Sequence, residues 1–290
     1  MSDLAAASYE RAQAPTRARR RRISIPVVLA GIVLLVGLVC AVFGPWIAPH
    51  DPNEQDLFAS LAGPSRNHLL GTDELGRDIL SRTIIGARTA ILGPALIAFG
   101  AMLIGNFFGV LAGYRGGTSD TVISRLVDFV YALPALLIAI VVVGVLGGGY
   151  WLAVGLLLVL FSPVDTRIVR AATLEQRNRP YVEAARLLGL SDRRIMARHV
   201  WPNVLPIALA NAFLTFAFAI VSLASLSFLG LGVGPGTADW GRMLSDSRNL
   251  LLDVPEAALA PGIAIVLVAV SVNILGDFLS ENLADRGRAR

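Results

Sequence analysis

Side chains that could carry out covalent chemistry are few in this sequence and lie far apart along it. The 290 residues include three histidines, His50, His68 and His199, and one cysteine, Cys40, inside an apolar run. This spacing predicts neither a metal-binding cluster nor an acid–base pair, and the acidic residues do not follow the spacing of an EF-hand. All 25 basic residues are arginines, whereas a P-loop ATPase needs the lysine of its phosphate-binding motif. We therefore expect no catalytic residue and no metal or cofactor bound by this chain.

One charged stretch, residues 180–203, stands between long apolar runs and carries the markers of two short helices. Pro180 suits a first helical turn, because its missing N–H is not needed there. Gly189 can end that helix in a left-handed conformation, and Ser191 can then cap a second helix. Pro202 is expected to stop the second helix.

Within this stretch, the pattern Glu-Ala-Ala-x-x-x-Gly with a proline thirteen positions after the glycine resembles the EAA loop of ABC-importer permeases. The wording AAR…LG…R-H-V-x-P-N is similar to the dipeptide/oligopeptide and nickel branch of that family. His199 and Trp201 depart from the Ile and Leu that are usual there. The resemblance implies a cytoplasmic element that docks on an ATPase subunit and couples its motion. The residues expected to serve this coupling are Glu183, Ala184, Ala185, Gly189, His199 and Pro202.

Composition indicates an all-α protein that crosses a membrane several times. Apolar residues make up 55% of the chain and charged residues 16%, whereas a soluble domain has about a quarter charged residues. The mean hydropathy is +0.66. Since one span needs about 20 apolar residues, we predict six transmembrane helices. They are expected at residues 27–48, 90–114, 122–146, 150–170, 205–229 and 257–276, with a kink at Pro134 in the third.

The arginines indicate how these helices are oriented, because cytoplasmic segments carry an excess of basic residues. With the N-terminus inside, only six of the 25 arginines face outward and 19 face the cytoplasm, together with both termini. The first apolar run is longer than that of a signal peptide, so we expect it to remain as a span. The expected parts are a cytoplasmic Arg-rich tail (1–26), a first transmembrane helix (27–48), an external segment with an interfacial helix (49–89), a five-helix permease core (90–280) that includes the cytoplasmic EAA loop (171–204), and a cytoplasmic tail (281–290).

Residues 68–89, HLLGTDELGRDILSRTIIGART, follow the first span on the expected outer side. Their wording LGTDxxGRDxxSR is similar to the same permease branch. We expect an interfacial hairpin and helix in which Asp73, Arg77 and Asp78 pair locally. The alternative is a contact of these three residues and Trp240 with an external substrate-binding protein.

A glycine-rich segment, residues 226–244 (LSFLGLGVGPGTADWGRML), also resembles this branch. Non-helical backbone at the depth of a membrane is buried in protein or lines a cavity. Leu223, just before this segment, stands where relatives commonly carry an acidic residue. The C-terminal stretch GDFLSENLADR also resembles the branch but departs from it at Ser280, where arginine is expected. If that acid binds a cation or a peptide amine in the family, its absence leaves the substrate class open.

Small residues recur every four positions in the second predicted span, at Ala101, Gly105, Gly109 and Gly113. Such a ridge lets two helix backbones approach closely inside a membrane, where no hydrophobic force drives helices together. We expect it to pack against another helix of this chain. A pore-lining or sliding face against a partner permease is the alternative.

Polar groups inside the spans are rare. Asn211 and Asn273 predict interhelical hydrogen bonds, with a polar substrate path as the alternative. Asp128 is expected to pair with Arg125, three residues earlier. Asp165 is expected to join a charge cluster with the arginines that follow it at the membrane boundary.

Four motif blocks in the family's order cover residues 68–286, and the predicted topology agrees with them. The resemblance implies one transmembrane subunit of a type I ABC importer, in the cytoplasmic membrane of a bacterium. It also implies a second homologous permease, two ABC ATPases that bind ATP and Mg, an extracytoplasmic solute-binding protein and membrane lipid as partners. Di- and oligopeptides are the expected substrates, and nickel, glutathione or another small solute is the alternative.

Three other classes of protein fit the sequence less well. A self-powered transporter needs an internal repeat with broken helices or a proton relay, and the sequence shows neither. A membrane enzyme needs a group of catalytic residues, and the scattered histidines do not provide one. Residues 180–203 also look like a basic helix-turn-helix, but they lie about ten residues from two spans, too close to enter a DNA groove. We therefore expect no nucleic-acid partner.

Overall fold

The computed structural model describes residues 24–288, and its side chains as far as residue 282. The regular secondary structure of these residues is helical, with one isolated antiparallel bridge between Thr72 and Asp78 and no strand among them. The helices are α2 (Ile25–Ile47), η1 (Leu57–Ala59), α3 (Ile79–Arg115), α4 (Gly117–Tyr131), α5 (Ala135–Val145), α6 (Tyr150–Arg177), α7 (Pro180–Leu187), α8 (Asp192–Ile195), the π-helical η2 (Met196–Val200), α9 (Trp201–Phe228), α10 (Trp240–Asp246) and α11 (Glu256–Arg288).

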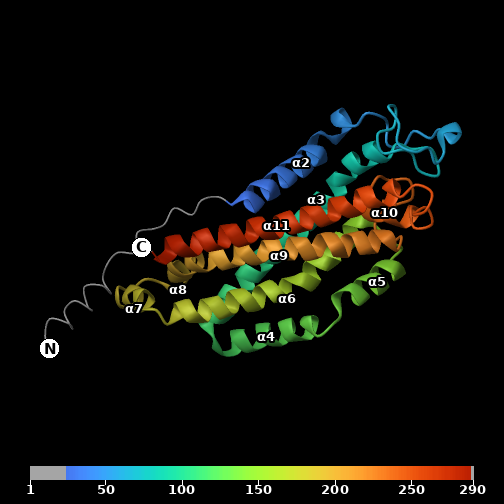
Figure 1. Cartoon of the computed structure of the whole chain (residues 1–290). Coiled ribbons are helices and arrows are strands. Elements are labelled where there is room, and N and C mark those ends of the chain that lie inside the picture. Colours follow the sequence, from blue (N-terminus) through green and yellow to red (C-terminus); the bar gives the residue numbers. More distant parts are fainter. Residues whose placement is uncertain (1–23, 289–290) are drawn as a thin grey trace, which may run out of the picture.

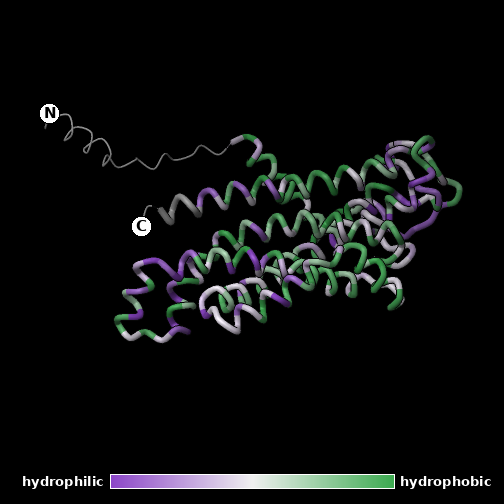
Figure 2. Tube along the Cα trace, turned by 90° about the horizontal axis from the view of Figure 1, so that it is seen from below, coloured by the Kyte–Doolittle hydropathy of each residue, from purple (hydrophilic) through white to green (hydrophobic). Residues whose placement is uncertain are grey.

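The long helices lie side by side in an elongated bundle (Figure 1). One end of the bundle carries α7 and α8, and we call it the α7 end. The opposite end carries α10 and the long connection between α2 and α3, and we call it the α10 end. Figure 2 shows that hydrophilic residues gather mostly at these two ends, with hydrophobic residues between them.

Five helices of the described chain are long and apolar enough to cross a membrane: α2, α3, α6, the continuous helix Asp192–Phe228, and α11. The third predicted span is not one helix. It is the pair α4 and α5, bent by 75° at a short break, with Pro134 at the N-cap of α5. Proline lacks an N–H and disfavours helical backbone in the residue before it, so the chain breaks where a kink was expected.

Two further helices differ in extent from the prediction. The interfacial helix expected before residue 90 is not a separate element, because α3 runs unbroken from Ile79 to Arg115. The last helix, α11, continues to Arg288 through the segment predicted as a C-terminal tail. Of the predicted N-terminal tail, only residues 24–26 lie within the described part of the chain.

The small-residue ridge of α3 packs against α6 of the same chain, as expected. A Cβ atom added to Gly109 would lie 2.7 Å from the Cβ of Val169, and one added to Gly113 would lie 2.8 Å from the carbonyl oxygen of Arg170. One added to Gly105 would collide with Asp165. The absence of side chains at these glycines is therefore what allows the two backbones to meet.

Helix α3 is central, since it contacts α2, α4, α6, α9 and α11. By contrast, α2 lies at the edge of the bundle (Figure 1) and buries only Ala30, Gly37 and Gly44. Gly37 faces Ile91, and Gly44 faces Ile85. Small residues thus hold α2 against α3, and its large apolar side chains remain free to face lipid.

Candidate functional site

Residues 180–203, where the sequence predicted a coupling segment, comprise α7, α8, the π-helical η2 and the start of α9, and the short helix α7 lies at the tip of this end. Pro180 occupies its first turn. Gly189 ends it with φ +74°, in the left-handed conformation that the sequence predicted. The N–H groups of Gly189 and Leu190 donate to the carbonyls of Arg186 and Ala185 at 2.9 and 3.2 Å. This is the hydrogen-bond pattern that closes a helix through a C-terminal glycine.

The two alanines of the predicted motif face opposite directions. Ala185 is buried, together with Val182, against the bundle, while Ala184 and Glu183 are exposed. Leu187 and Leu188 stand out further, at 84% and 81% exposure. Helix α7 thus has an anchored face and a free face.

The anchored face packs into an apolar cluster at the end of the bundle. Its fully buried members come from α6, from residues 180–203 and from α9: Val169, Val182, Ile195, Val200, Val204 and Ala208. Tyr114, near the end of α3, belongs to the same cluster. Its hydroxyl donates to Asp192 Oδ1 at 2.9 Å and accepts from Arg186 Nε at 3.4 Å, so one side chain joins α3 to both short helices.

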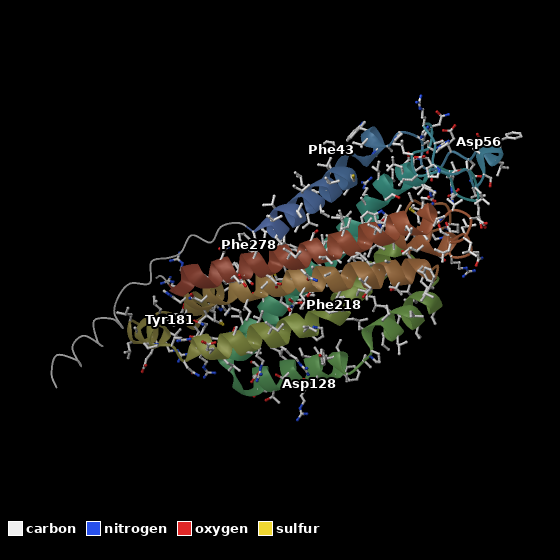
Figure 3. All side chains as sticks on the ribbon, in the orientation of Figure 1. Phe43, Asp56, Asp128, Tyr181, Phe218 and Phe278 are labelled. Carbon is white, nitrogen blue, oxygen red and sulfur yellow. The ribbon has the colours of Figure 1, made fainter. Side chains whose placement is uncertain are left out.

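Tyr114 was not among the residues singled out from the sequence. It lies in the GYRGG turn after the ridge of small residues, but a tyrosine at a helix end is too common to suggest an interhelical link by itself. Tyr181, on α7, makes a second polar contact at the tip of this end (Figure 3), where its hydroxyl donates to Gln176 Oε1 at 2.8 Å.

Pro202 does not stop the second helix, contrary to expectation. It lies in the first turn of α9, and the helix continues from α8 through the π-helical turn Met196–Val200. Wider π-type turns can leave room for a proline ring and its missing hydrogen bond. Ser191 occupies the N-cap of α8 without a side-chain cap bond.

Two of the positions that depart from the family pattern lie at this junction, His199 inside the π-helical turn and Trp201 directly after it. His199 is half-buried, and its carbonyl accepts from Asn203 Nδ2 at 2.6 Å. Trp201 Nε1 donates to Asn106 Oδ1 on α3 at 3.2 Å. The tryptophan thus adds a link between α9 and α3.

Charge pairs near the α7 end also differ from the prediction. Asp128 pairs with Arg167 on α6, not with Arg125. Asp165 is 1% exposed and accepts from Asn211 Nδ2 at 2.8 Å, away from the arginines that follow it. Positions two and five residues further along a helix lie about 200° and 140° around its axis. Asp165 can therefore face the interior while those arginines face outward.

Of the two asparagines predicted to bond between helices, Asn211 does so through Asp165. Asn273 is half-buried and makes no side-chain hydrogen bond within the described chain. Leu223, the departure from an acidic residue, is 5% exposed and packs in an apolar cluster with Ile97 and Leu157. The structure thus gives this position an apolar setting.

At the α10 end, the predicted external residues form a buried charge network. Asp73 Oδ1 accepts from the backbone N–H of Arg77 at 3.0 Å, and its Oδ2 accepts from Arg77 Nε at 2.7 Å. Arg82, 2% exposed, lies 3.7 Å from the same carboxylate and donates to the carbonyls of Pro52 and Gly236 at 3.0 and 3.2 Å. This network joins the long connection after α2 to the glycine-rich loop before α10.

Trp240 also links α10 to α3, since its Nε1 donates to the carbonyl of Thr83 at 2.8 Å. Asp73, Arg77, Asp78 and Trp240 are each less than a tenth exposed. They hold the α10 end together and offer little free surface of their own.

Asp78 pairs with His68 and not with Arg77 (Nδ1 to Oδ1, 2.9 Å). His50 and His68, which the sequence suggested were far apart, have ring centroids 4.8 Å apart. Folding brings them together because His50 follows α2 and His68 precedes α3. Together with Asp78 they place one imidazole or carboxylate atom each within 4.8 Å of the others.

The family model for a "binding-protein-dependent transport system inner membrane component" matches residues 105–288. This chain belongs to that family. A second model, the N-terminal transmembrane domain of oligopeptide transport permease C, matches residues 19–64. The chain is therefore an ABC-transporter permease with several membrane spans, located in the inner membrane, as its sequence predicted.

Similar proteins include peptide permeases from several bacteria. The di/tripeptide transport system permease protein DppC of Pseudomonas aeruginosa is 39% identical, over 88% of this chain and 86% of that protein. The probable D,D-dipeptide permease DdpC of Escherichia coli K12 is 35% identical, over 88% and 86%. The glutathione permease GsiD of Pectobacterium atrosepticum is 36% identical, over 88% and 85%.

Among solved structures, the inward-facing MetNI methionine ABC transporter has the same fold. Its matched chain gives a TM-score of 0.56 at 20% identity, over 69% of this chain and 95% of the matched one. The predicted type I ABC importer permease fold is thus confirmed.

Proposed function

We propose that this chain is one permease subunit of an ATP-driven importer of short peptides, and that the free face of α7 docks on an ABC ATPase. A second homologous permease and an extracytoplasmic binding protein would complete the complex with two ATPases. ATP and Mg would bind to the ATPases. The permease would contribute a conformational change and a translocation pathway, and no covalent chemistry.

The observation that carries this proposal is the split character of α7. Glu183, Ala184, Leu187 and Leu188 form an exposed face, and two of them are leucines more than four-fifths exposed. Exposed leucines at the polar end of a membrane protein are unfavourable in water and typical of a protein interface. The small side chain of Ala184 allows a partner surface to approach the helix axis.

The anchored face supplies a route by which movement of α7 reaches the spans. Tyr114 links α7 and α8 to α3. Helix α8 continues through η2 into α9 without an end. A movement of α7 would therefore act on α3 and α9 together. It would also reach α6, because glycines of α3 pack closely against that helix.

The orientation follows from the same assignment. The α7 end carries many of the arginines of the described chain, including Arg177, Arg179, Arg186 and Arg193, and basic segments remain on the cytoplasmic side of a membrane. We place the α7 end in the cytoplasm and the α10 end outside, where a binding protein would deliver the solute.

Short peptides are the proposed substrate class because the relatives described above transport di/tripeptides, D,D-dipeptides or glutathione. Glutathione is itself a modified tripeptide, so it belongs to the same class. The proposal favours an unmodified di- or tripeptide, since the relative with the higher identity of the three, 39%, is a di/tripeptide permease.

The docking proposal is tested by placing charge on the free face. Leu187→Glu should lower substrate-stimulated ATP hydrolysis of the reconstituted complex by about tenfold or more, because truncating an interface hot spot costs upwards of 2 kcal/mol. The matched control is Leu252→Glu, since Leu252 is 97% exposed and lies between α10 and α11 at the other end. Wild-type hydrolysis in Leu187→Glu, with the chain inserted normally, would contradict the proposal.

The substrate proposal is tested separately by uptake into proteoliposomes that contain the whole complex. We expect labelled di- and tripeptides to be taken up and to compete with one another, and glutathione to compete less well. Uptake of glutathione alone would reassign the substrate without affecting the ATPase assignment.

A further inference from the structure

Three side chains from three separate segments meet at the α10 end, outside the charge network described above. His50 follows the last turn of α2, His68 lies in the connection between α2 and α3, and Asp78 is the N-cap residue of α3. His68 Nδ1 lies 2.9 Å from Asp78 Oδ1, and His50 Nδ1 lies 3.7 Å from Asp78 Oδ2. Both imidazoles therefore direct the same nitrogen toward one carboxylate.

Asp78 is held rigidly in this position. It is 3% exposed, and its Oδ2 accepts from Ser81 N at 2.8 Å and from Ser81 Oγ at 2.6 Å. Burial opposes ionisation of this carboxyl, but the hydrogen bonds from Ser81 and His68 outweigh that effect and lower its pKa. Asp78 is thus oriented by hydrogen bonds from a neighbouring serine, as metal-binding carboxylates usually are.

His50 provides the observation that points to a ligand. Its Nδ1 is buried and has no hydrogen-bond partner within the described chain, whereas buried polar atoms in proteins are nearly always satisfied. Its backbone N–H donates to Ser81 Oγ at 3.0 Å. This bond holds His50 next to the Asp78 carboxylate, with which its side chain makes no hydrogen bond. The side chain of His50 remains 36% exposed and that of His68 22% exposed, which leaves an approach from solvent.

We propose that His50, His68 and Asp78 bind one divalent transition-metal ion of the zinc class. Two imidazole nitrogens and one carboxylate oxygen form a donor set that suits Zn²⁺, and three protein ligands leave a fourth position for water. Ligand atoms about 2.0–2.1 Å from a tetrahedral ion lie about 3.3 Å from one another. Here His68 Nδ1 and His50 Nδ1 lie 2.9 and 3.7 Å from the two oxygens of Asp78, and one ligand atom of each residue lies within 4.8 Å of the others. Binding through Nδ1 requires the tautomer of neutral His68 that carries its proton on Nε2, so that the Nδ1 lone pair faces the ion.

Such an ion would act as a tie between helices. It would join the end of α2 to the start of α3, and α2 buries only three of its residues. The proposal rests on the geometry of this cluster alone and does not depend on which solute the permease carries.

The test uses the full chain in lipid nanodiscs, purified without a polyhistidine tag. A Cys40→Ser background removes the thiol as a competing ligand. Zn²⁺ is titrated against a chromophoric chelator, and Co²⁺ absorption reports the coordination geometry. We expect one ion per chain, with a tetrahedral Co²⁺ spectrum. His50→Ala should weaken binding by more than the roughly 10–100-fold cost of losing an outer-shell partner.

His50→Ala suits this test because its side chain makes no hydrogen bond in the described chain, so its loss should not unfold the protein. His68→Ala should weaken binding equally, and His199→Ala, which changes the remaining histidine at the other end, should leave binding unchanged. Zn²⁺ should also raise the midpoint of thermal unfolding of the parent chain but not of His50→Ala. The proposal is overturned if the parent chain binds no Zn²⁺ at 100-fold molar excess, or if both His50→Ala and His68→Ala bind it as tightly as the parent.

Discussion

At the α10 end of the bundle, Asp73, Arg77 and Arg82 are each less than a tenth exposed and pair with one another. At the α7 end, Glu183 is exposed and Leu187 is 84% exposed. Residues 68–89 at the α10 end and residues 180–203 at the α7 end both contain several arginines and acidic residues, so their composition alone does not distinguish them. The charged residues of the network at the α10 end are buried, whereas α7 buries its apolar face and exposes Glu183 and Leu187.

This difference indicates a division of labour within the permease. Buried ion pairs are costly to disturb, because removal of one partner leaves an uncompensated charge. They suit an end that must keep its shape. A short helix with an exposed face, linked to two spans, suits an end that receives force from a partner.

The largest effect is expected from Asp73→Ala, which breaks the buried network. Arg77 and Arg82 would lose their shared carboxylate, and loss of one partner of a buried pair costs about 3–5 kcal/mol. Thermal unfolding of the purified chain should show a clear loss of stability. Glu54→Ala, at an exposed position of the same connection, is the control, and an equal stability of the two variants would mean that the α10 end is not rigid in the way proposed here.

A smaller effect is expected from Gly109→Ala, in the close contact between α3 and α6, which both run along the bundle. The added Cβ would lie 2.7 Å from Val169, and overpacking of a tight interior costs about 1–3 kcal/mol. Gly155→Ala on α6 provides the matched control, because a Cβ there meets nothing within 4 Å. Unfolding measured in detergent should separate the two variants. If they unfold alike, α3 and α6 are not locked together by their glycines.

The smallest effect on stability is expected from Tyr114→Phe. It removes the hydroxyl that bonds Asp192 and should cost about 1 kcal/mol. If α7 docks on an ATPase as proposed, its effect on coupled ATP hydrolysis should be larger than its effect on unfolding, because the hydroxyl links α3 to α7 and α8. A double-mutant cycle with Asp192→Asn measures the link directly. Additive changes in coupling across that cycle would show that Tyr114 does not transmit movement.

Much of the fold was predictable because it depends on local rules. Long apolar runs located the spans, and Gly189 ended α7 in the expected left-handed conformation. The ridge of Gly105, Gly109 and Gly113 indicated a close helix contact before its partner was known. The errors in the helices themselves concerned where they end. Pro134 broke a span, and Pro202 was absorbed by a π-helical turn. A proline can break, bend or begin a helix, and neighbouring contacts select the outcome.

The sequence by itself determined that this protein crosses a membrane several times and carries a short charged helix ended by Gly189, because hydropathy and glycine act within a few residues. Only the tertiary structure decided how its polar groups pair. Asp128 bonds Arg167, 39 residues away, and Asp165 bonds Asn211, 46 residues away. His50 and His68 meet at Asp78 because α2 and α3 pack with their ends together. Such pairs depend on which faces of the helices meet, and spacing along the chain does not encode that choice.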